Sequence, residues 1–477
     1  MQVSILYLLV CDSILGDLYR AANQSLLGSC RLVRTLQPGR LTMKRLFFRL
    51  VAVGLGAMLC LGGAVRGQRN EFERSPIDYL TAPVNDAVAR LNDRLAQGDV
   101  TLATDPQLGY LPAVLDALDI PASSQTLVFS KTSLQLQRIS PRTPRALYFN
   151  DEVYVGFCQN GDLLELAATD PKQGAIFYTL DQSAAGTLRF VRDDGSCLSC
   201  HATSRTLDVP GYVVRSVFPD ASGRPRSGSR SFTTNHTSDF QDRWGGWYVT
   251  GTHGSMRHLG NTISTGMDQS FDRERGANRT DLRGLFPTDP YLTPHSDLVA
   301  LMVLEHQAQM HNAITAAGFE TRQAVHQSEQ MNEILERPPG YLSESAQRRI
   351  AKSADLVLRT LLMCDEFALT SPVEGSTEFA AEFSGRGVRD SQGRSLRDFD
   401  LQTRLFRYPC SYLIHSDAFR SLPSEVLSPI IDRLRAILDG TEESPEYAHL
   451  TPELRRDISA ILIETLPEFR LFPLAQN

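Results

Sequence analysis

The sequence predicts an α+β protein, with a β-rich domain followed by a mainly α-helical one. Short runs of β-branched and aromatic residues, separated by turn residues, fill the chain from about residue 126 to 251. From about residue 294, apolar residues recur at steps of three and four, as on one face of a helix. The chain, at 477 residues, is also long for a single core. We therefore expect an N-terminal extension over 1–67, an α+β domain over 68–293 and a helical domain over 294–477.

The N-terminal extension has the layout of a secretory signal peptide. Lys44 and Arg45 follow Met43, and an uncharged, mostly apolar run occupies 50–64. Small residues then precede a predicted cleavage before Gln68. We expect translation to begin at Met43 and the mature protein to be exported, for example to the periplasm. An uncleaved leader would instead anchor the protein to the membrane, although the apolar run is short for a membrane span.

The β-rich domain is predicted to begin with a helix and to continue as strands. Apolar residues recur with helical spacing in the segment from Ser75 to Val100. The predicted strands lie in the runs 126–140, 145–159, 163–170, 174–180, 211–218 and 245–251. A polar loop rich in arginine and serine separates the last two runs. We therefore expect most strands of the protein in this domain.

Four helices are predicted in the C-terminal domain. The first has Ser296 as its N-cap and runs for about six turns, and the second has Ser343 as its N-cap. The third ends at Gly440, a C-cap position, and Pro429 is expected to limit its start to about that residue. The fourth has Thr451 as its N-cap, with a proline at the first helical position.

The motif C-x-x-C-H occurs once, at Cys197, Cys200 and His201 in the stretch "GSCLSCHATS". Two thiols at this spacing can add as thioethers to the two vinyl groups of a haem. The histidine directly after the second cysteine then supplies the proximal nitrogen to the iron. With eight cysteines and ten histidines in the chain, accidental matches are expected on the order of 0.003 times. The motif therefore predicts one covalently bound haem c.

Three other interpretations of the motif stay open. Cys197 and Cys200 could form a redox disulfide, but a thioredoxin-like site requires a strand before the motif and a helix after it. They could be half of a zinc site, but the chain holds no second C-x-x-C and His201 lies unusually close. They could also have no chemical role, although their spacing argues against this.

A single "CLSCH" on an exported chain resembles a c-type cytochrome domain. It is unlike the small all-helical cytochrome c, because β-rich sequence precedes the motif. The order of "SLQLQRISPRTPRAL", "LRFVRDDGSCLSCHA" and "VPGYVVRSVFPD" is similar to exported c-haem domains of PAS-like fold, over about residues 130–220. That resemblance implies that a strand leads into the motif and that a pair of strands follows it. The whole chain resembles cytochrome c domain-containing proteins, which implies haem binding and electron transfer.

The second axial ligand is predicted to come from "RWGGWYVTGTHGSMRHLGN", residues 243–261. His253, Met256 and His258 lie within six residues, and the glycines around them would let a side chain approach a haem closely. We expect His253 to be the second metal ligand. The helical segment 302–310 is an alternative source of the second ligand. A stripe of methionine and histidine at helical spacing is, however, more typical of core packing.

Together these features predict an exported c-type cytochrome that exchanges electrons with redox partner proteins. Two other functions stay open, each with an open position on the iron: a haem-based sensor or gas-binding module, and a haem oxidoreductase enzyme. The net charge of −7 counts against nucleic-acid binding. We assign no catalytic residue, because the chain has no P-loop, Rossmann fingerprint, H-E-x-x-H or G-x-S-x-G motif. The sequence gives no indication of the oligomeric state.

Overall fold

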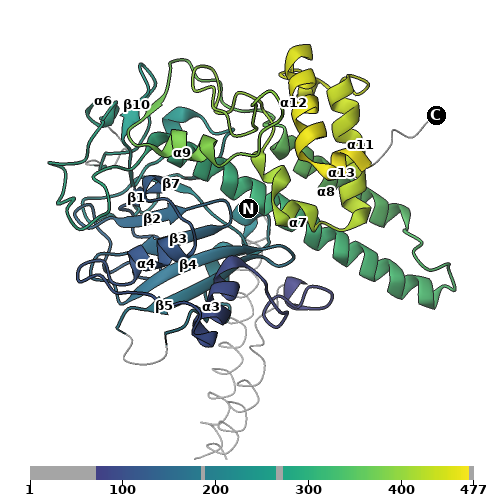
Figure 1. The fold of residues 1–477 in the computed structure, drawn as a ribbon, viewed down its shortest axis with the longest axis horizontal. Coiled ribbons are helices and arrows are strands. Elements are labelled where there is room, and N and C mark those ends of the chain that lie inside the picture. The colour runs from purple at the N-terminus through teal and green to yellow at the C-terminus, as the bar shows by residue number, and fades with distance from the viewer. Residues whose placement is uncertain (1–70, 184–187, 265–271, 472–477) are drawn as a thin grey trace, which may run out of the picture. The chain divides into compact units, whose positions relative to one another are not determined.

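The computed structural model describes residues 71–183, 188–264 and 272–471 (Figure 1). These residues belong to one compact unit. They form a seven-stranded antiparallel sheet and, after it, a mainly helical C-terminal part, so the predicted α+β class is confirmed. The predicted extension and signal peptide over 1–67 lie outside the described residues. No described helix is both long and apolar enough to cross a membrane.

Short strands make up one large sheet and two small ones. The large sheet contains β1 (Thr126–Val128), β2 (Arg145–Phe149), β3 (Val153–Phe157), β4 (Leu163–Asp170), β5 (Gly174–Asp181), β6 (Val191–Arg192) and β9 (Trp247–Tyr248). Its order is β6-β5-β4-β3-β2-β1-β9, with antiparallel neighbours throughout. The small sheets pair β7 (Arg215–Val217) with β8 (Ser231–Thr233), and β10 (Gly251–Thr252) with β11 (Glu374–Gly375). Every run predicted as extended contains a strand, whereas β8 lies in the stretch expected to be a polar loop.

The described residues contain eleven α-helices and six 3₁₀ turns. The α-helices are α3 (Ala87–Gln97), α4 (Leu111–Ala117), α5 (Leu198–His201), α6 (Arg273–Gly276), α7 (Leu298–Ile334), α8 (Glu344–Leu361), α9 (Phe379–Gly385), α10 (Asp417–Arg420), α11 (Ser424–Asp439), α12 (Pro452–Thr465) and α13 (Pro467–Leu471). The 3₁₀ turns are η2 (Glu71–Glu73), η3 (Ala122–Ser124), η4 (Ser204–Thr206), η5 (Phe240–Asp242), η6 (Tyr412–His415) and η7 (Pro445–Tyr447).

The two faces of the large sheet differ in burial. Successive side chains of a strand point to opposite faces, so each strand contributes to both. One face is fully buried, with Tyr148, Val155, Leu166 and Tyr178 among its residues. The hydroxyl of Tyr178 donates to the carboxylate of Asp86, the N-cap of α3, at 2.6 Å, so α3 covers this face. The opposite face is only partly covered by protein.

Helix α7 links the sheet to the helical part. Its N-cap is Asp297, not the predicted Ser296, because the Asp297 carboxylate accepts two backbone N–H groups of the first turn at 2.8 and 3.1 Å. The hydroxyl of Ser296 accepts the N–H of Leu127 at 2.9 Å and donates to the carbonyl of Tyr248 at 2.7 Å. Ser296 therefore ties β1 and β9 to the start of the helix. Serine and aspartate are both good N-caps, so the sequence signal alone was ambiguous.

Helix α11 begins earlier than Pro429 was expected to allow. It starts at Ser424, so the proline lies inside it. Val426, Ile430 and Leu434 recur at steps of four and are fully buried, and the helix packs against α8 and α12. This burial outweighs the backbone hydrogen bond that a proline removes. The predicted caps that are confirmed are Ser343, Gly440 and Thr451.

The sheet and the helices share one hydrophobic core. Buried apolar residues of both parts belong to the same cluster. Helix α7 contacts β5 and β10, and it also contacts α8 and α11. The change of sequence character near residue 294 falls just before α7. The division into two domains at that point stays a prediction.

Candidate functional site

The C-x-x-C-H motif lies in a tight turn that follows β6, the edge strand of the large sheet. The carboxylate of Asp193 accepts the N–H of Gly195 at 2.9 Å and the N–H of Cys197 at 3.0 Å, and it also accepts the hydroxyl of Ser196. Gly195 has a φ of 115°, a backbone conformation that favours glycine. These contacts fold the chain back directly before the first cysteine.

His201, the last residue of α5, is held by the backbone of Gly211. Its Nδ1 donates to the Gly211 carbonyl at 2.9 Å, and the Gly211 N–H donates to the His201 carbonyl at 2.9 Å. Its ring also packs against Phe177 of β5, with centroids 4.8 Å apart. Burial lowers the pKa of His201 and outweighs the hydrogen bond to Gly211, which favours the charged form. The imidazole is therefore neutral, with Nδ1 protonated and Nε2 carrying the lone pair.

Asn312 of α7 fixes the position of Gly211 from the other side. Its side-chain amide accepts the N–H of Tyr212 and donates to the carbonyl of Tyr212, both at 2.8 Å. A Cβ atom on Gly211 would lie 2.2 Å from the Asn312 oxygen, so any other residue here would displace the Asn312 side chain or the local backbone. Through Asn312, helix α7 thus contacts the Gly211–Tyr212 segment that holds the imidazole of His201.

The partly covered face of the sheet adjoins His201. One register row runs across five strands, through Leu147, Gly156, Glu165, Thr179 and Val191. Of these residues only the glycine is fully buried, and Val191 is 46% exposed. Phe177, which contacts His201, lies two residues before Thr179 on β5 and so points to this face. The face beside the motif combines apolar and polar groups with charged ones, and the guanidinium of Arg145 lies over Gly156.

One ion pair lies on this face. Arg145 of β2 and Glu165 of β4 form a salt bridge of 2.7 Å, with side chains 18% and 13% exposed. Both charges act on the pKa of His201, so they lie near the imidazole. The ion pair and the register row together define what we call the open face, made of Arg145, Leu147, Gly156, Glu165, Thr179 and Val191.

The two cysteines of the motif are free thiols. Cys200 is exposed and Cys197 is partly buried. Burial, reinforced by the charge of Asp193, raises the pKa of Cys197 to about 12. A redox-active C-x-x-C site needs a thiol with a lowered pKa, so the redox-disulfide interpretation loses support. Among the described residues, no group of three or more histidine, cysteine, aspartate or glutamate side chains is placed to hold a metal ion, and the zinc interpretation stays open.

His253, the predicted second ligand, is buried elsewhere in the fold. Its Nε2 accepts the N–H of Asn278 at 3.0 Å, and its ring packs against Phe240 and His258. These contacts of His253 lie outside the C-x-x-C-H segment. No contact among the described residues supports a shared site for His253 and His201, and the assignment of His253 as a ligand stays a prediction.

Several residues that shape the site carry no recognisable sequence signal. Asp193 stands in a loop sequence with no sign of its role, yet it organises the turn before Cys197. Phe177 and Asn312 lie 24 and 111 residues from His201 in the chain, so no local pattern connects them. Gly211 stands in a "PGY" turn, which marks a bend but does not indicate its bond to His201.

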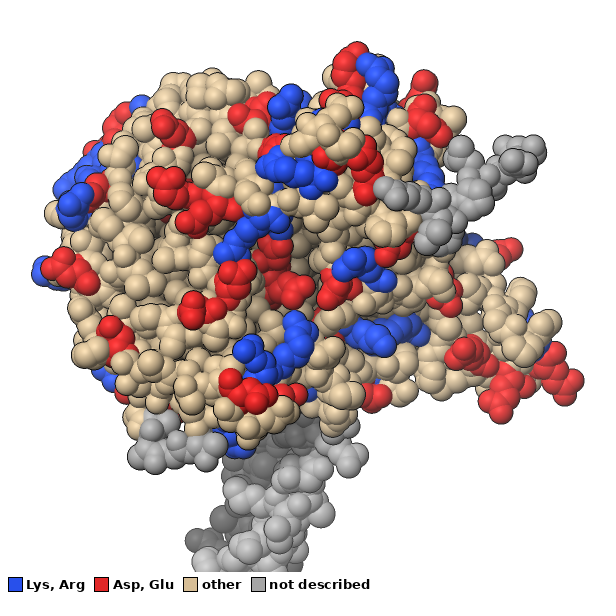
Figure 2. Space-filling model, in the orientation of Figure 1, with Lys and Arg blue, Asp and Glu red and all other residues tan. Residues whose placement is uncertain are grey.

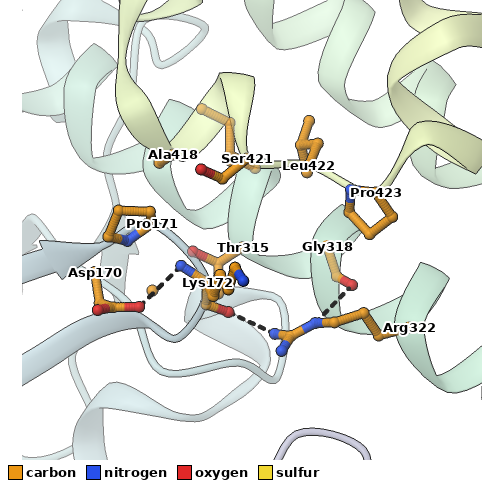
Figure 3. A pocket seen from close by; sticks show the side chains of 12 residues that line it. Asp170, Pro171, Lys172, Thr315, Gly318, Arg322, Ala418, Ser421, Leu422 and Pro423 are labelled. Carbon is orange, nitrogen blue, oxygen red and sulfur yellow. Dashed lines mark hydrogen bonds between the residues drawn. The ribbon is translucent and has the colours of Figure 1, made fainter. Parts of the chain in front are cut away.

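A cavity of about 300 Å³ lies between the β4–β5 turn, α7 and α10 (Figure 3). Two of its three charged side chains, those of Asp170 and Arg322, already bind the backbone. The Asp170 carboxylate accepts the N–H of Lys172 at 2.8 Å, and Arg322 donates to the carbonyls of Gly318 and Lys172. No residue of the motif lines this cavity. The cavity is therefore separate from the motif.

Basic and acidic side chains are mixed over the face in view in Figure 2. No family model, curated protein or solved structure matches the chain.

Proposed function

We propose that the protein is an exported c-type cytochrome that carries one haem, bound covalently through Cys197 and Cys200, with His201 as its proximal ligand. The observation that carries this proposal is the hydrogen bond from Nδ1 of His201 to the Gly211 carbonyl. Histidines that bind metals commonly donate their second ring N–H to a backbone carbonyl, which fixes the tautomer and the orientation of the ring. A neutral imidazole with a free Nε2 fits haem iron.

The thiols and the sheet also fit a haem. Both cysteines are free, and the more exposed one leaves room for a bulky substituent on its sulfur. The open face lies beside His201, and its partly or fully exposed residues Leu147, Thr179 and Val191 could pack against the porphyrin. When bound, the haem would supply one-electron chemistry, with the iron cycling between its ferric and ferrous states.

Within this proposal each described residue has a defined task. Gly211 and Phe177 hold the imidazole in one orientation, and Asp193 holds the turn that presents the thiols. Cys200 and Val191 are exposed, so the attachment site lies at the protein surface. Electrons would then pass over a short path to a redox partner protein that docks there. Export follows from the predicted leader, and an uncleaved leader would keep the protein at the membrane.

A second candidate function is a haem protein with an open sixth position on the iron, either a sensor or gas-binding module or an oxidoreductase enzyme. The observation that favours it concerns the described residues that could supply a sixth ligand. His253 has its Nε2 occupied by Asn278, and the open face contains neither histidine nor methionine. Whether the protein turns over a substrate would then depend on a small molecule reaching the iron.

The test is an optical spectrum of protein matured in cells that carry a cytochrome c assembly system. We expect haem absorption in the wild type and its loss in the Cys197→Ala, Cys200→Ala double variant. Ser199→Ala, between the two cysteines and exposed, is the matched control and should retain the haem. A reduced spectrum that does not change when CO is added would favour electron transfer. A reduced spectrum that shifts when CO is added would favour an open sixth position on the iron. Absence of haem in the wild type would overturn both.

A further inference from the structure

The cavity between the β4–β5 turn, α7 and α10 carries several polar side chains on its wall (Figure 3). Its volume of about 300 Å³ is at the lower end of the range for pockets that bind small molecules. Thr315 and Arg322 come from α7, Lys172 from the turn and Ser421 from the residue after α10. The side chains of Lys172 and Ser421 are exposed and form the rim, so a small molecule can enter from solvent.

The polar groups that lack a partner in this cavity can all donate a hydrogen bond. Thr315 is only 7% exposed, and its hydroxyl bonds to no described residue. The half-buried Arg322 uses its Nε and Nη2 on backbone carbonyls, whereas its Nη1 and the ammonium of Lys172 have no partner among the described residues. A polar side chain as deeply buried as Thr315 normally has a partner. The cavity therefore lacks a hydrogen-bond acceptor.

The charged side chains that line the cavity add up to a net charge of +1. Lys172 and Arg322 are positive, and Asp170 is the one negative residue of the wall. The Asp170 carboxylate is already used by the backbone. It accepts the N–H groups of Lys172 and Gln173, both at 2.8 Å, and that of Asn85 at 2.7 Å. Neither Lys172 nor Arg322 forms an ion pair with a described residue, so both cations lack a counter-ion.

The rest of the wall is apolar. Ile314, Ala418 and Leu422 are buried there, and two prolines are partly buried. Gly318 lies in the interior of α7, where glycine is unfavourable. A Cβ on Gly318 would lie 3.5 Å from Leu422, which is ordinary contact, so glycine leaves room that a larger residue would fill. A ligand with an anionic group and a small carbon body would contact both kinds of wall.

We propose that this cavity binds a small organic phosphate monoester. Thr315, Lys172 and Arg322 hold the phosphate, and the carbon body packs against Leu422 and its apolar neighbours. Such a phosphate carries about −1.5 to −2 charges at neutral pH and has three strong acceptor oxygens, which match two cations and a hydroxyl. A carboxylate has a single charge and two oxygens in one plane, so it matches these groups less well. No residue of the motif lines the cavity, so this binding is separate from haem binding.

Isothermal calorimetry on the full-length matured protein, near neutral pH and at fixed ionic strength, tests this assignment. The probe is glycerol 3-phosphate, with glycerol as the uncharged control and succinate as the carboxylate control. The site variants are Lys172→Gln, Arg322→Gln and Thr315→Val. One matched control is Lys352→Gln, an exposed lysine on α8. The other is Thr321→Val, whose hydroxyl is buried in α7 without a partner but does not line the cavity.

We expect glycerol 3-phosphate to bind the wild type and both control variants with equal affinity, and each site variant to weaken binding at least tenfold. Hydrogen bonds to a charged group are strong enough for such a loss. Thr315→Val keeps nearly the same side-chain shape, so it tests the hydroxyl alone. Arg322→Gln also removes contacts with two backbone carbonyls, so its fold is checked by urea unfolding.

The assignment is overturned if glycerol 3-phosphate does not bind, or if Lys172→Gln and Thr315→Val bind it as tightly as the controls do. Equal or tighter binding of glycerol or succinate would also overturn it. The same titration on the haem-free Cys197→Ala, Cys200→Ala protein should give the wild-type affinity. Failure of haem attachment is therefore a separate result, which appears in the optical spectrum and leaves the calorimetry interpretable.

Discussion

His201 and the backbone of Gly211 are joined by two hydrogen bonds, each 2.9 Å long. One runs from Nδ1 to the Gly211 carbonyl, and the other returns from the Gly211 N–H to the His201 carbonyl. Gly211 is in turn fixed by its neighbour Tyr212, whose backbone is held at both ends by Asn312. The imidazole of His201, which would bind iron, is therefore positioned by Gly211 and, through Tyr212, by Asn312 of α7.

A side chain on Gly211 should disturb this arrangement. In Gly211→Ala the new Cβ would lie 2.2 Å from the Asn312 side-chain oxygen, so the Asn312 side chain or the Gly211 backbone must shift. We expect a loss of about 1–3 kcal/mol in the free energy of unfolding, as is typical of overpacking, and a changed midpoint potential of the haem. Gly385→Ala is the control, because no atom lies within 4 Å of its new Cβ. Equal behaviour of the two variants would refute the role of Gly211.

Asn312→Ala should show whether Asn312 positions His201 or only stabilises the fold. It leaves two buried backbone groups of Tyr212 without partners, at a cost of roughly 1–3 kcal/mol. Asn92 binds the backbone of Phe190 in the same way, with two bonds of 3.0 Å, so Asn92→Ala is a matched control. Urea unfolding should show similar losses for both variants. Only Asn312→Ala should move the midpoint potential, and a shift of the same size in both would count against the positioning role.

The buried ion pair between Arg243 and Glu305 should matter far more than a surface pair. The two side chains are 4% and 0% exposed and lie 3.0 Å apart. Glu305→Ala leaves the arginine charge buried without its carboxylate, which costs about 3–5 kcal/mol. Glu344→Ala breaks the exposed pair with Arg348 and should cost at most about 0.5 kcal/mol. The comparison is made by urea unfolding at neutral pH, and similar losses would contradict the assigned burial.

Buried histidines should make the fold sensitive to acid. Burial lowers the pKa of His236 to about 4, and the nearby charge of Arg243 adds to this effect, while Asp365 opposes it. The folded state then favours the neutral ring. Its contribution to stability is complete above the ordinary pKa of about 6.5 and is lost as the pH falls towards 4. His306, whose ring faces His236, has its pKa lowered by burial too and acts in the same direction.

We therefore expect His236→Gln to flatten the fall in unfolding free energy between pH 6.5 and 4 relative to the wild type, as measured by urea unfolding across that range. The carboxyl of Glu305 acts in the opposite direction, because burial raises its pKa to about 7. His326→Gln is the control, since that ring bonds to Gln330 on the exposed side of α7. An unchanged slope in His236→Gln would show that another group causes the acid sensitivity.

The sequence predicted those parts of the fold and site that local patterns encode. The run "LLELAATD" coincides with β4, and the caps Ser343 and Thr451 follow from side chains that bond N–H groups of the next turn. The three residues of the motif were identified from their spacing alone. Ser296 was misassigned because its hydroxyl binds two strands that lie far from it in the sequence.

The rest of the site depends on contacts between distant segments. The open face exists because five strands align Leu147 with Val191 in one row, and register is set by pairing across the whole sheet. The bond between His201 and Gly211 depends on a turn whose path is fixed by Asn312. No pattern of apolar residues or turn residues along the chain encodes these relationships.

The central claim is that the haem is covalently attached at Cys197 and Cys200. The most direct measurement is haem absorbance of the matured chain after denaturation and acidic solvent extraction, which remove haem that is not covalently bound. We predict that the absorbance stays with the wild-type chain and with Ser199→Ala. The double variant Cys197→Ala, Cys200→Ala should lose it. A wild-type chain that carries no haem after the extraction would contradict covalent attachment at Cys197 and Cys200.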